Sequence, residues 1–300
     1  MLNFRVCARN AKLRICANDC AVFFWSGWHS YAPFRSGFGF GGSVASCLRS
    51  VELAMAAFEL NNLTLGYAGH PAVHHLQGRF ETGSLTAVVG PNGSGKSTLL
   101  KGLAGLLKPM TGSILSAGLS RKDLAYLPQA GELDLNFPAT VAELVEMGLW
   151  AKHGLFKPHT DADRDAVVLA ISKVGLQGFE NRQIGSLSGG QLQRTLFARL
   201  ILQDSRIILL DEPFTAIDEN TTEDLMKLIN QWHSEGRTVL AVLHDFAFVK
   251  RHFPQTLLLA REPVAWGTTA EVMSAANLAK VQHLIEAWDE SADECEVEAA

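Results

Sequence analysis

The chain has 300 residues, 47% of them hydrophobic, and a formal net charge of −5. This length suits one large α/β domain or two small ones, and the acidic balance argues against a broad basic surface for nucleic acid. No apolar run approaches the roughly 18–20 residues that cross a bilayer. The five cysteines form no CxxC pair and no zinc-like pattern, which favours reduced thiols in a cytoplasm.

Residues 1–54 differ from the rest of the chain. They are rich in arginine, aromatic residues and glycine, and they show neither the period of a strand nor that of a helix. A targeting peptide would need a longer apolar core, and a metal site at Cys7, Cys16 and Cys20 would need a fourth ligand. We expect this extension to be disordered or to come from an upstream start codon, with Met55 as the functional start.

A strand pattern begins at residue 58. Two strands are predicted over residues 58–65 and 73–80, with a bend at Asn61-Asn62 and a polar turn over residues 69–71 between them. A buried strand follows at residues 85–89 and leads directly into a glycine-rich loop and an apolar-periodic helix.

This strand–loop–helix order is the context that a phosphate-binding loop requires. Its glycines let successive N–H groups point at one anion, and the start of the helix adds the positive end of its dipole. Lys96 can reach the β- and γ-phosphates, and the Ser97 hydroxyl can ligate Mg²⁺. We therefore predict a nucleotide site rather than a plain turn. The loop consists of Gly90, Pro91, Asn92, Gly93, Ser94, Gly95, Lys96, Ser97 and Thr98.

Further strands and a helical segment follow the loop. Strands are predicted at residues 113–115 and 123–127, and helices at residues 141–149 and 160–174, the latter stopped by Gly175. We expect a helical insertion over about residues 133–190 between two halves of an α/β core.

The core resumes with two buried parallel strands over residues 206–211 and 238–243. Edge strands are expected at residues 256–259 and 264–266, and one closing helix at residues 270–288. The carboxylate-rich residues 289–300 read as a disordered tail. The organised domain is therefore predicted to span residues 55–288.

Two carboxylates stand at the end of the first of these buried strands. Asp211 occupies the place where a second Mg²⁺ ligand belongs in a phosphate-loop ATPase, and Glu212 is placed to polarise a water for attack on the γ-phosphate. Alone, an Asp-Glu pair after a strand would be an ordinary loop start. Together with the phosphate loop, the pair predicts catalysis.

A second helix start carries small and polar residues at positions 187–191. Ser188, Gly189, Gly190 and Gln191 open a helix whose exposed N–H groups can bind an anion. A second anion-binding terminus in one chain suggests a second phosphate contact.

The combined set resembles the ATP-binding cassette (ABC) ATPases over about residues 57–268. The resemblance implies an α/β fold: a P-loop NTPase core of ABC-ATPase type with an antiparallel β subdomain and an inserted α-helical subdomain. It also implies ATP and Mg²⁺ as cofactors and a head-to-tail dimer with a second copy of the chain. Each ATP would lie between one phosphate loop and the other copy's Ser188–Gln191.

The same resemblance assigns four more side chains. Tyr67 would stack on adenine, and Gln129 would sense Mg²⁺ as a ligand and contact the membrane subunits. Asp218, in the 215–218 loop, would act across the dimer. His244 would touch the γ-phosphate and assist Glu212.

Two functional classes follow from the resemblance, a motor for a membrane transporter and a cassette that acts on nucleic acid or ribosomes. The acidic charge and the single cassette favour the transporter and predict no nucleic-acid partner. We expect an importer in which this chain is cytoplasmic and peripheral on the inner face of the membrane. Its partners would be separate permease subunits and, indirectly, an extracytoplasmic metal-binding protein.

The cargo is suggested by resemblance alone. Residues 137–141 and 147–148 look like the zinc and manganese branch of importers, and residues 154–156 and the stretch 253–267 look closest to zinc-importer ATPases. Zinc is therefore the expected cargo, with manganese or iron next and a siderophore or haem as a more distant alternative. The ten histidines are interpreted as surface residues, since none has ligand companions at metal spacing.

Overall fold

The computed structural model describes residues 5–6, 15–17, 20–21, 56–116, 118–154, 160–215 and 217–287. The chain divides into two compact units, Met1–Ser43 and Val44–Ala300. The first contains three short antiparallel strands, β1 (Arg5–Val6), β2 (Ile15–Ala17) and β3 (Cys20–Ala21). The predicted start at Met55 and the acidic tail lie outside the described residues, so the domain limits stay predictions.

A six-stranded sheet forms the centre of the second unit, in the order β12-β11-β6-β10-β9-β8. Neighbouring strands are parallel except for β12, which pairs antiparallel with β11. All residues of β6, β9 and β10 are buried, as their continuous apolar runs predict. The strand bounds are β6 (Leu85–Val89), β8 (Leu124–Leu127), β9 (Ile207–Asp211), β10 (Thr238–Val242), β11 (Gln255–Ala260) and β12 (Glu262–Thr268).

A second, antiparallel sheet has the order β5-β4-β7. It consists of β4 (Ala56–Tyr67), β5 (His70–Glu81) and β7 (Thr111–Ser116). The register of β4 shifts at the Asn61-Asn62 pair, both against β5 and against β7. Asn62 has a φ of 45°, and together these features confirm the predicted bend. The turn between the two long strands is shorter than predicted, because β5 already begins at His70.

The helices begin where their capping residues predict. Thr140, Thr160 and Ser188 each form a capping box, and Gly175 follows the second of these helices with a φ of 72°. The α-helices are α2 (Lys96–Leu103), α3 (Val141–Glu146), α4 (Trp150–His153), α5 (Asp161–Lys173), α6 (Gly189–Gln203), α7 (Glu219–Ser234), α8 (Phe246–His252), α9 (Thr269–Val272) and α10 (Ala275–Ala287). Short 3₁₀ turns cover Arg121–Asp123, Ala130–Glu132, Met147–Leu149 and Ile184–Ser186.

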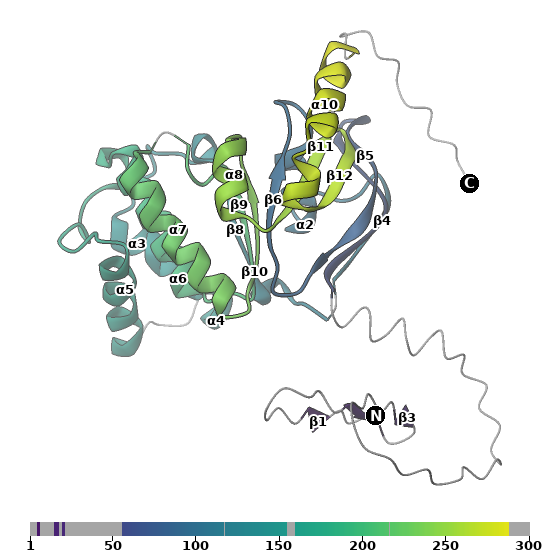
Figure 1. The fold of residues 1–300 in the computed structure, drawn as a ribbon. Helices are drawn as coiled ribbons and strands as arrows, with labels where there is room; N and C mark the ends of the chain where they lie inside the picture. The colour runs from purple at the N-terminus through teal and green to yellow at the C-terminus, as the bar shows by residue number, and fades with distance from the viewer. Residues whose placement is uncertain are drawn as a thin grey trace. The chain divides into compact units, whose positions relative to one another are not determined.

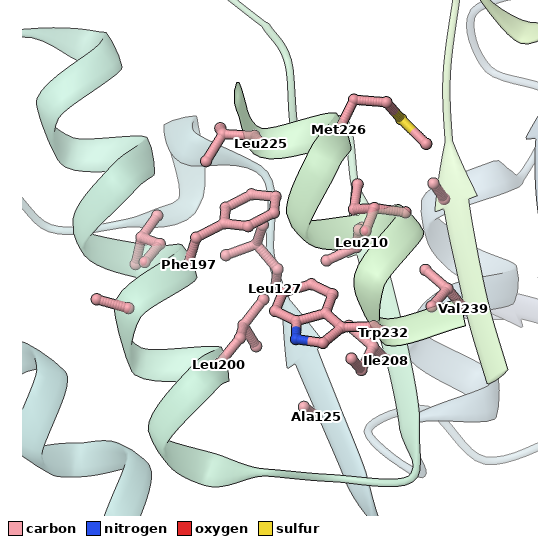
Figure 2. Packing of buried hydrophobic residues seen from close by; sticks show 14 of the residues in the cluster. Ala125, Leu127, Phe197, Leu200, Ile208, Leu210, Leu225, Met226, Trp232 and Val239 are labelled. Atoms are coloured by element: carbon pink, nitrogen blue, oxygen red, sulfur yellow. The ribbon is translucent and has the colours of Figure 1, made fainter. Parts of the chain in front are cut away.

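Two hydrophobic clusters cover opposite faces of the six-stranded sheet. Because side chains alternate along a strand, Ala87 joins the cluster under α3, α5, α6, α7 and α8, whereas Val88 joins the cluster with α2 and the antiparallel sheet. Figure 1 shows these two layers on either side of the central strands. In the helical layer, Phe197 of α6 stacks on Trp232 of α7 with the ring centroids 5.7 Å apart, and Leu127 and Leu210 lie nearby (Figure 2).

The fold class is confirmed, but two details of the prediction are wrong. Strand β11 is an interior strand, between β6 and β12, rather than an edge strand. The closing helix is two helices, because α9 ends at Val272 and α10 starts only at Ala275. No helix among the described residues is long and apolar enough to cross a membrane.

Candidate nucleotide site

The loop between β6 and α2 can follow its course only because it contains glycine at crowded positions. Gly95 has a φ of 88°, and a Cβ there would lie 2.4 Å from the Ala72 carbonyl oxygen. A Cβ at Gly90 would lie 1.9 Å from the Leu259 carbonyl oxygen. The loop therefore packs its backbone against β5 and β11 and leaves its N–H groups near the start of α2.

Lys96 is a buried cation inside this loop. Its Nζ donates hydrogen bonds to the carbonyl oxygens of Gly90 at 3.0 Å and Pro91 at 2.7 Å. Burial lowers the pKa of Lys96, and the nearby carboxylates of Glu212 and Asp211 act in the opposite direction. The ammonium is thus held near the two carboxylates at the end of β9.

Asp211 ends β9 and is only 1% exposed. Its carboxylate accepts hydrogen bonds from the Ser97 hydroxyl at 2.9 Å and from the Tyr126 hydroxyl at 3.4 Å. Burial raises the pKa of Asp211, although these two hydrogen bonds act to lower it. The structure therefore brings together Ser97 and Asp211, two of the three predicted Mg²⁺ ligands.

Glu212 collects three donors from three different segments. Its Oε1 lies 2.5 Å from His244 Nε2, and its Oε2 accepts hydrogen bonds from Gln129 Nε2 at 2.8 Å and Thr215 Oγ1 at 3.2 Å. Burial acts to raise the pKa of Glu212, but the hydrogen bonds from His244, Thr215 and Gln129 outweigh it and lower the pKa. Glu212 has a φ of 49°, so the backbone turns sharply directly after β9.

The donor set fits Mg²⁺ and a phosphate chain. The Ser97 hydroxyl, the Asp211 carboxylate and the amide oxygen of Gln129 are the oxygen ligands that Mg²⁺ prefers, and the Gln129 nitrogen is already engaged with Glu212. Ser94 Oγ is buried and has no hydrogen-bond partner within the described part of the chain. The loop therefore retains an unused polar atom beside a glycine backbone.

The second predicted anion site lies at the start of α6. The Ser188 hydroxyl oxygen accepts a hydrogen bond from the Gln191 N–H, and the Gln191 side-chain oxygen accepts one from the Ser188 N–H. A Cβ at Gly190 would lie 3.6 Å from Asp218 Oδ2, so Asp218 packs beside this helix start. Asp218 itself caps α7 through the Thr221 N–H at 2.9 Å and the Thr221 hydroxyl at 2.7 Å.

Tyr67 lies at the tip of the β4–β5 hairpin, where it pairs with His70 and is 50% exposed. Its predicted stacking on adenine stays a prediction, and Ala216 of the 215–218 loop lies outside the described residues.

Sequence reasoning missed two partners of the carboxylates. The sequence places Thr215 only in the loop expected to act across the dimer, and Tyr126 only in a strand. No local signal marks Tyr126, because its contact with Asp211 depends on the pairing of β8 with β9.

Three similarities connect this chain with known proteins. The sequence model of the family described as ABC transporter matches residues 73–215. The chain is 39% identical over 220 residues to the manganese transport system ATP-binding protein MntB of Listeria monocytogenes, which covers 72% of this chain and 92% of the relative. It is 34% identical over 226 residues to the chelated iron transport system membrane protein YfeB of Yersinia pestis, which covers 73% and 76%.

A solved structure shares the fold. It is the dimeric, post-hydrolysis state of an ATP-binding cassette bound to ADP and Pi. The TM-score is 0.62 at 27% sequence identity, and the match covers 71% of this chain and 98% of that chain.

Proposed function

Because the chain belongs to the ATP-binding subunits of ABC transporters, we propose that it is the ATPase motor of an importer for a divalent transition metal. The observation that carries this proposal is the convergence of Ser97, Asp211, Gln129, Glu212 and His244 around one loop. They come from four segments, with Ser97 in α2, Gln129 just past β8, Asp211 and Glu212 at the end of β9 and His244 just past β10, so only the folded cassette brings them together.

The roles of the residues follow from their contacts. Lys96 and the loop N–H groups would hold the phosphates of ATP, and Tyr67 would stack on its base. Glu212 stays ionised, since its donors lower its pKa, and it would orient a water for attack on the γ-phosphate. His244 would hold that carboxylate and the phosphate end together. Mg²⁺ bound to Ser97, Asp211 and Gln129 would neutralise charge on the phosphates.

The second anion site would serve a second copy of the chain. Among the described residues, no hydrogen bond joins Ser188–Gln191 to the loop at Gly90–Thr98, whereas Asp218 lies against Gly190. We infer that each ATP is held between the loop of one copy and Ser188–Gln191 of the other. The dimeric state of the related solved cassette supports this arrangement.

A groove beside α3 would receive the permease. It has a volume of about 320 Å³ and contains the exposed side chains of Phe137 and Trp150. It lies close in sequence to Gln129, which donates to Glu212 at 2.8 Å. Docking of separate permease subunits there would place the chain peripherally at the cytoplasmic face of the membrane, with an extracytoplasmic metal-binding protein on the other side.

Manganese is the cargo that the relatives favour. The Listeria relative is named for manganese, and the Yersinia relative is named for chelated iron. The expectation of zinc rests on short stretches of resemblance and has no such support, so zinc stands behind manganese and iron as cargo.

The ATPase is tested with Lys96→Ala, which removes the buried cation of the loop. We expect ATP turnover by the purified chain to be abolished; turnover equal to that of the wild type would refute the phosphate-loop assignment.

The cargo is tested by total cell metal in a strain that lacks this chain and is complemented by wild type or Lys96→Ala. We expect a manganese deficit that only the wild type restores. A deficit in zinc or iron would retain the motor and change the cargo. Normal metal content in the absence of a redundant importer would refute metal import.

A further inference from the structure

Strand β8 and the residues just after it supply one hydrogen-bond donor to each of the adjacent carboxylates Asp211 and Glu212. Tyr126 donates to Asp211 at 3.4 Å, and Gln129, just past the end of the strand, donates to Glu212 at 2.8 Å. β8 pairs in parallel with β9, with Tyr126 opposite Leu209. Asp211 therefore lies two positions along the neighbouring strand and on the same face, within reach of a long aromatic side chain.

Packing alone does not require the Tyr126 hydroxyl. The ring packs against the apolar cluster between the two sheets, where phenylalanine would serve equally well. The hydroxyl faces the second oxygen of a carboxylate whose first oxygen accepts from Ser97. Since an ionised carboxylate is only an acceptor, Tyr126 is the donor in this contact.

We propose that Tyr126 is a positioning residue for the metal-binding carboxylate Asp211. Its hydroxyl holds Oδ2, so that Oδ1 is presented toward Ser97, where the cation of the bound nucleotide would be shared. This inference rests on the proposed function, because it concerns the Mg²⁺ of that same site. Groups that orient a metal ligand through a hydrogen bond typically change metal affinity by about 10–100-fold when they are removed.

The position of Tyr126 is itself fixed by helix α6. Arg199 Nη2 donates to the Tyr126 carbonyl oxygen at 3.1 Å, and Gln203 Nε2 donates to the Leu124 carbonyl oxygen at 2.9 Å. These two donors stand one helical turn apart and cover alternate carbonyls of an edge strand. The hydroxyl is therefore carried by a backbone that is held on both sides, by β9 and by α6.

The experiment compares Tyr126→Phe with wild type in the full chain. ATPase rates are measured at fixed ATP over a range of free Mg²⁺ concentrations. Because the 3.4 Å contact is long, we expect an effect at the lower end of the range: about a tenfold rise in the half-saturating Mg²⁺ concentration. The rate at saturating Mg²⁺ is expected to stay within about threefold of wild type, since the reacting groups are unchanged. Ser205→Ala, which removes a buried hydroxyl with a contact of the same length just before β9 begins, at the end of the strand opposite to Asp211, should keep the wild-type Mg²⁺ requirement.

A second measurement needs no turnover. The thermal midpoint is recorded with ATP in EDTA and then with ATP and increasing Mg²⁺. Tyr126→Phe should match wild type in EDTA and need about tenfold more Mg²⁺ for the same further increase. An unchanged Mg²⁺ requirement, or a lower midpoint in EDTA as the sole effect, would overturn the proposal in favour of a packing role. If the wild type hydrolyses no ATP, the proposed function fails, while this binding measurement still decides the role of Tyr126.

Discussion

Replacement of Glu212 by glutamine isolates the chemical role of one carboxylate with little change in shape. The side chain accepts from His244 through one oxygen and from Gln129 and Thr215 through the other. Glu212→Gln removes the negative charge that would orient and polarise the attacking water. It leaves untouched the loop that would bind the phosphates. We therefore expect ATP binding to persist and hydrolysis to stop.

The expected magnitudes differ greatly between rate and stability. Loss of a positioned general base typically costs about 10²–10⁴-fold in rate. The amide oxygen can keep the donors Gln129 and Thr215, and its NH₂ group can donate to a neutral His244, so at most about one hydrogen bond, near 1 kcal/mol, is lost. The φ of 49° is equally strained for both side chains. The variant should therefore fold like wild type.

The assay pairs steady-state ATP hydrolysis with gel filtration in ATP and Mg²⁺. The variant should elute as a dimer, because the ATP that would bridge two copies is not consumed. Glu235→Gln makes the same chemical change at a surface pair with Arg237 and should leave both readouts at wild-type values. Wild-type hydrolysis by Glu212→Gln would refute its catalytic role, and a monomer in ATP would refute the shared-nucleotide dimer.

Two further predictions concern stability. Because burial raises the pKa of Asp211, its ionised form costs stability at pH values above the folded pKa, and the cost is relieved as the pH falls. Asp211→Asn should therefore stabilise the nucleotide-free protein by about 1 kcal/mol at pH 7 and by less at pH 4. It should also abolish Mg²⁺-dependent hydrolysis. Chemical unfolding at the two pH values measures the stability gain, and equal gains at both would contradict the reasoning. Phe197→Ala removes a fully buried ring that stacks on Trp232 and should cost about 3–5 kcal/mol in the same assay, whereas a loss below about 1 kcal/mol would show that the helical layer repacks.

The phosphate loop and the two carboxylates could be predicted because their signals are local. A glycine-rich loop between a buried strand and a helix has few other uses, and Asp211 directly follows four branched apolar residues of one strand. The helix starts at Thr140, Thr160 and Ser188 were equally readable, since a capping box lies within four consecutive residues.

Apart from the local contact of Thr215 with Glu212, the errors and omissions depend on contacts between distant segments. Strand β11 is interior because β12 folds back beside it, which its own residues do not specify. The predicted closing helix is interrupted between α9 and α10. The start of α9 is held by the Thr269 hydroxyl, which hydrogen-bonds to the Phe253 carbonyl and to the Thr256 hydroxyl. The contact of Tyr126 with Asp211 depends on the order and register of β8 and β9, which no local pattern encodes.

Asp211 and Glu212 are neighbours in the chain, yet the structure shifts their pKa values in opposite directions. Burial dominates at Asp211 and raises its pKa, whereas donors from three segments dominate at Glu212 and lower its pKa. Such a separation is what distinct roles require. A buried carboxylate that is costly to ionise is stabilised most strongly by a nearby cation, while one kept ionised by fixed donors is ready to orient water. Cation binding at Asp211 would therefore offset the free-energy cost of burying this ionised carboxylate in the folded cassette.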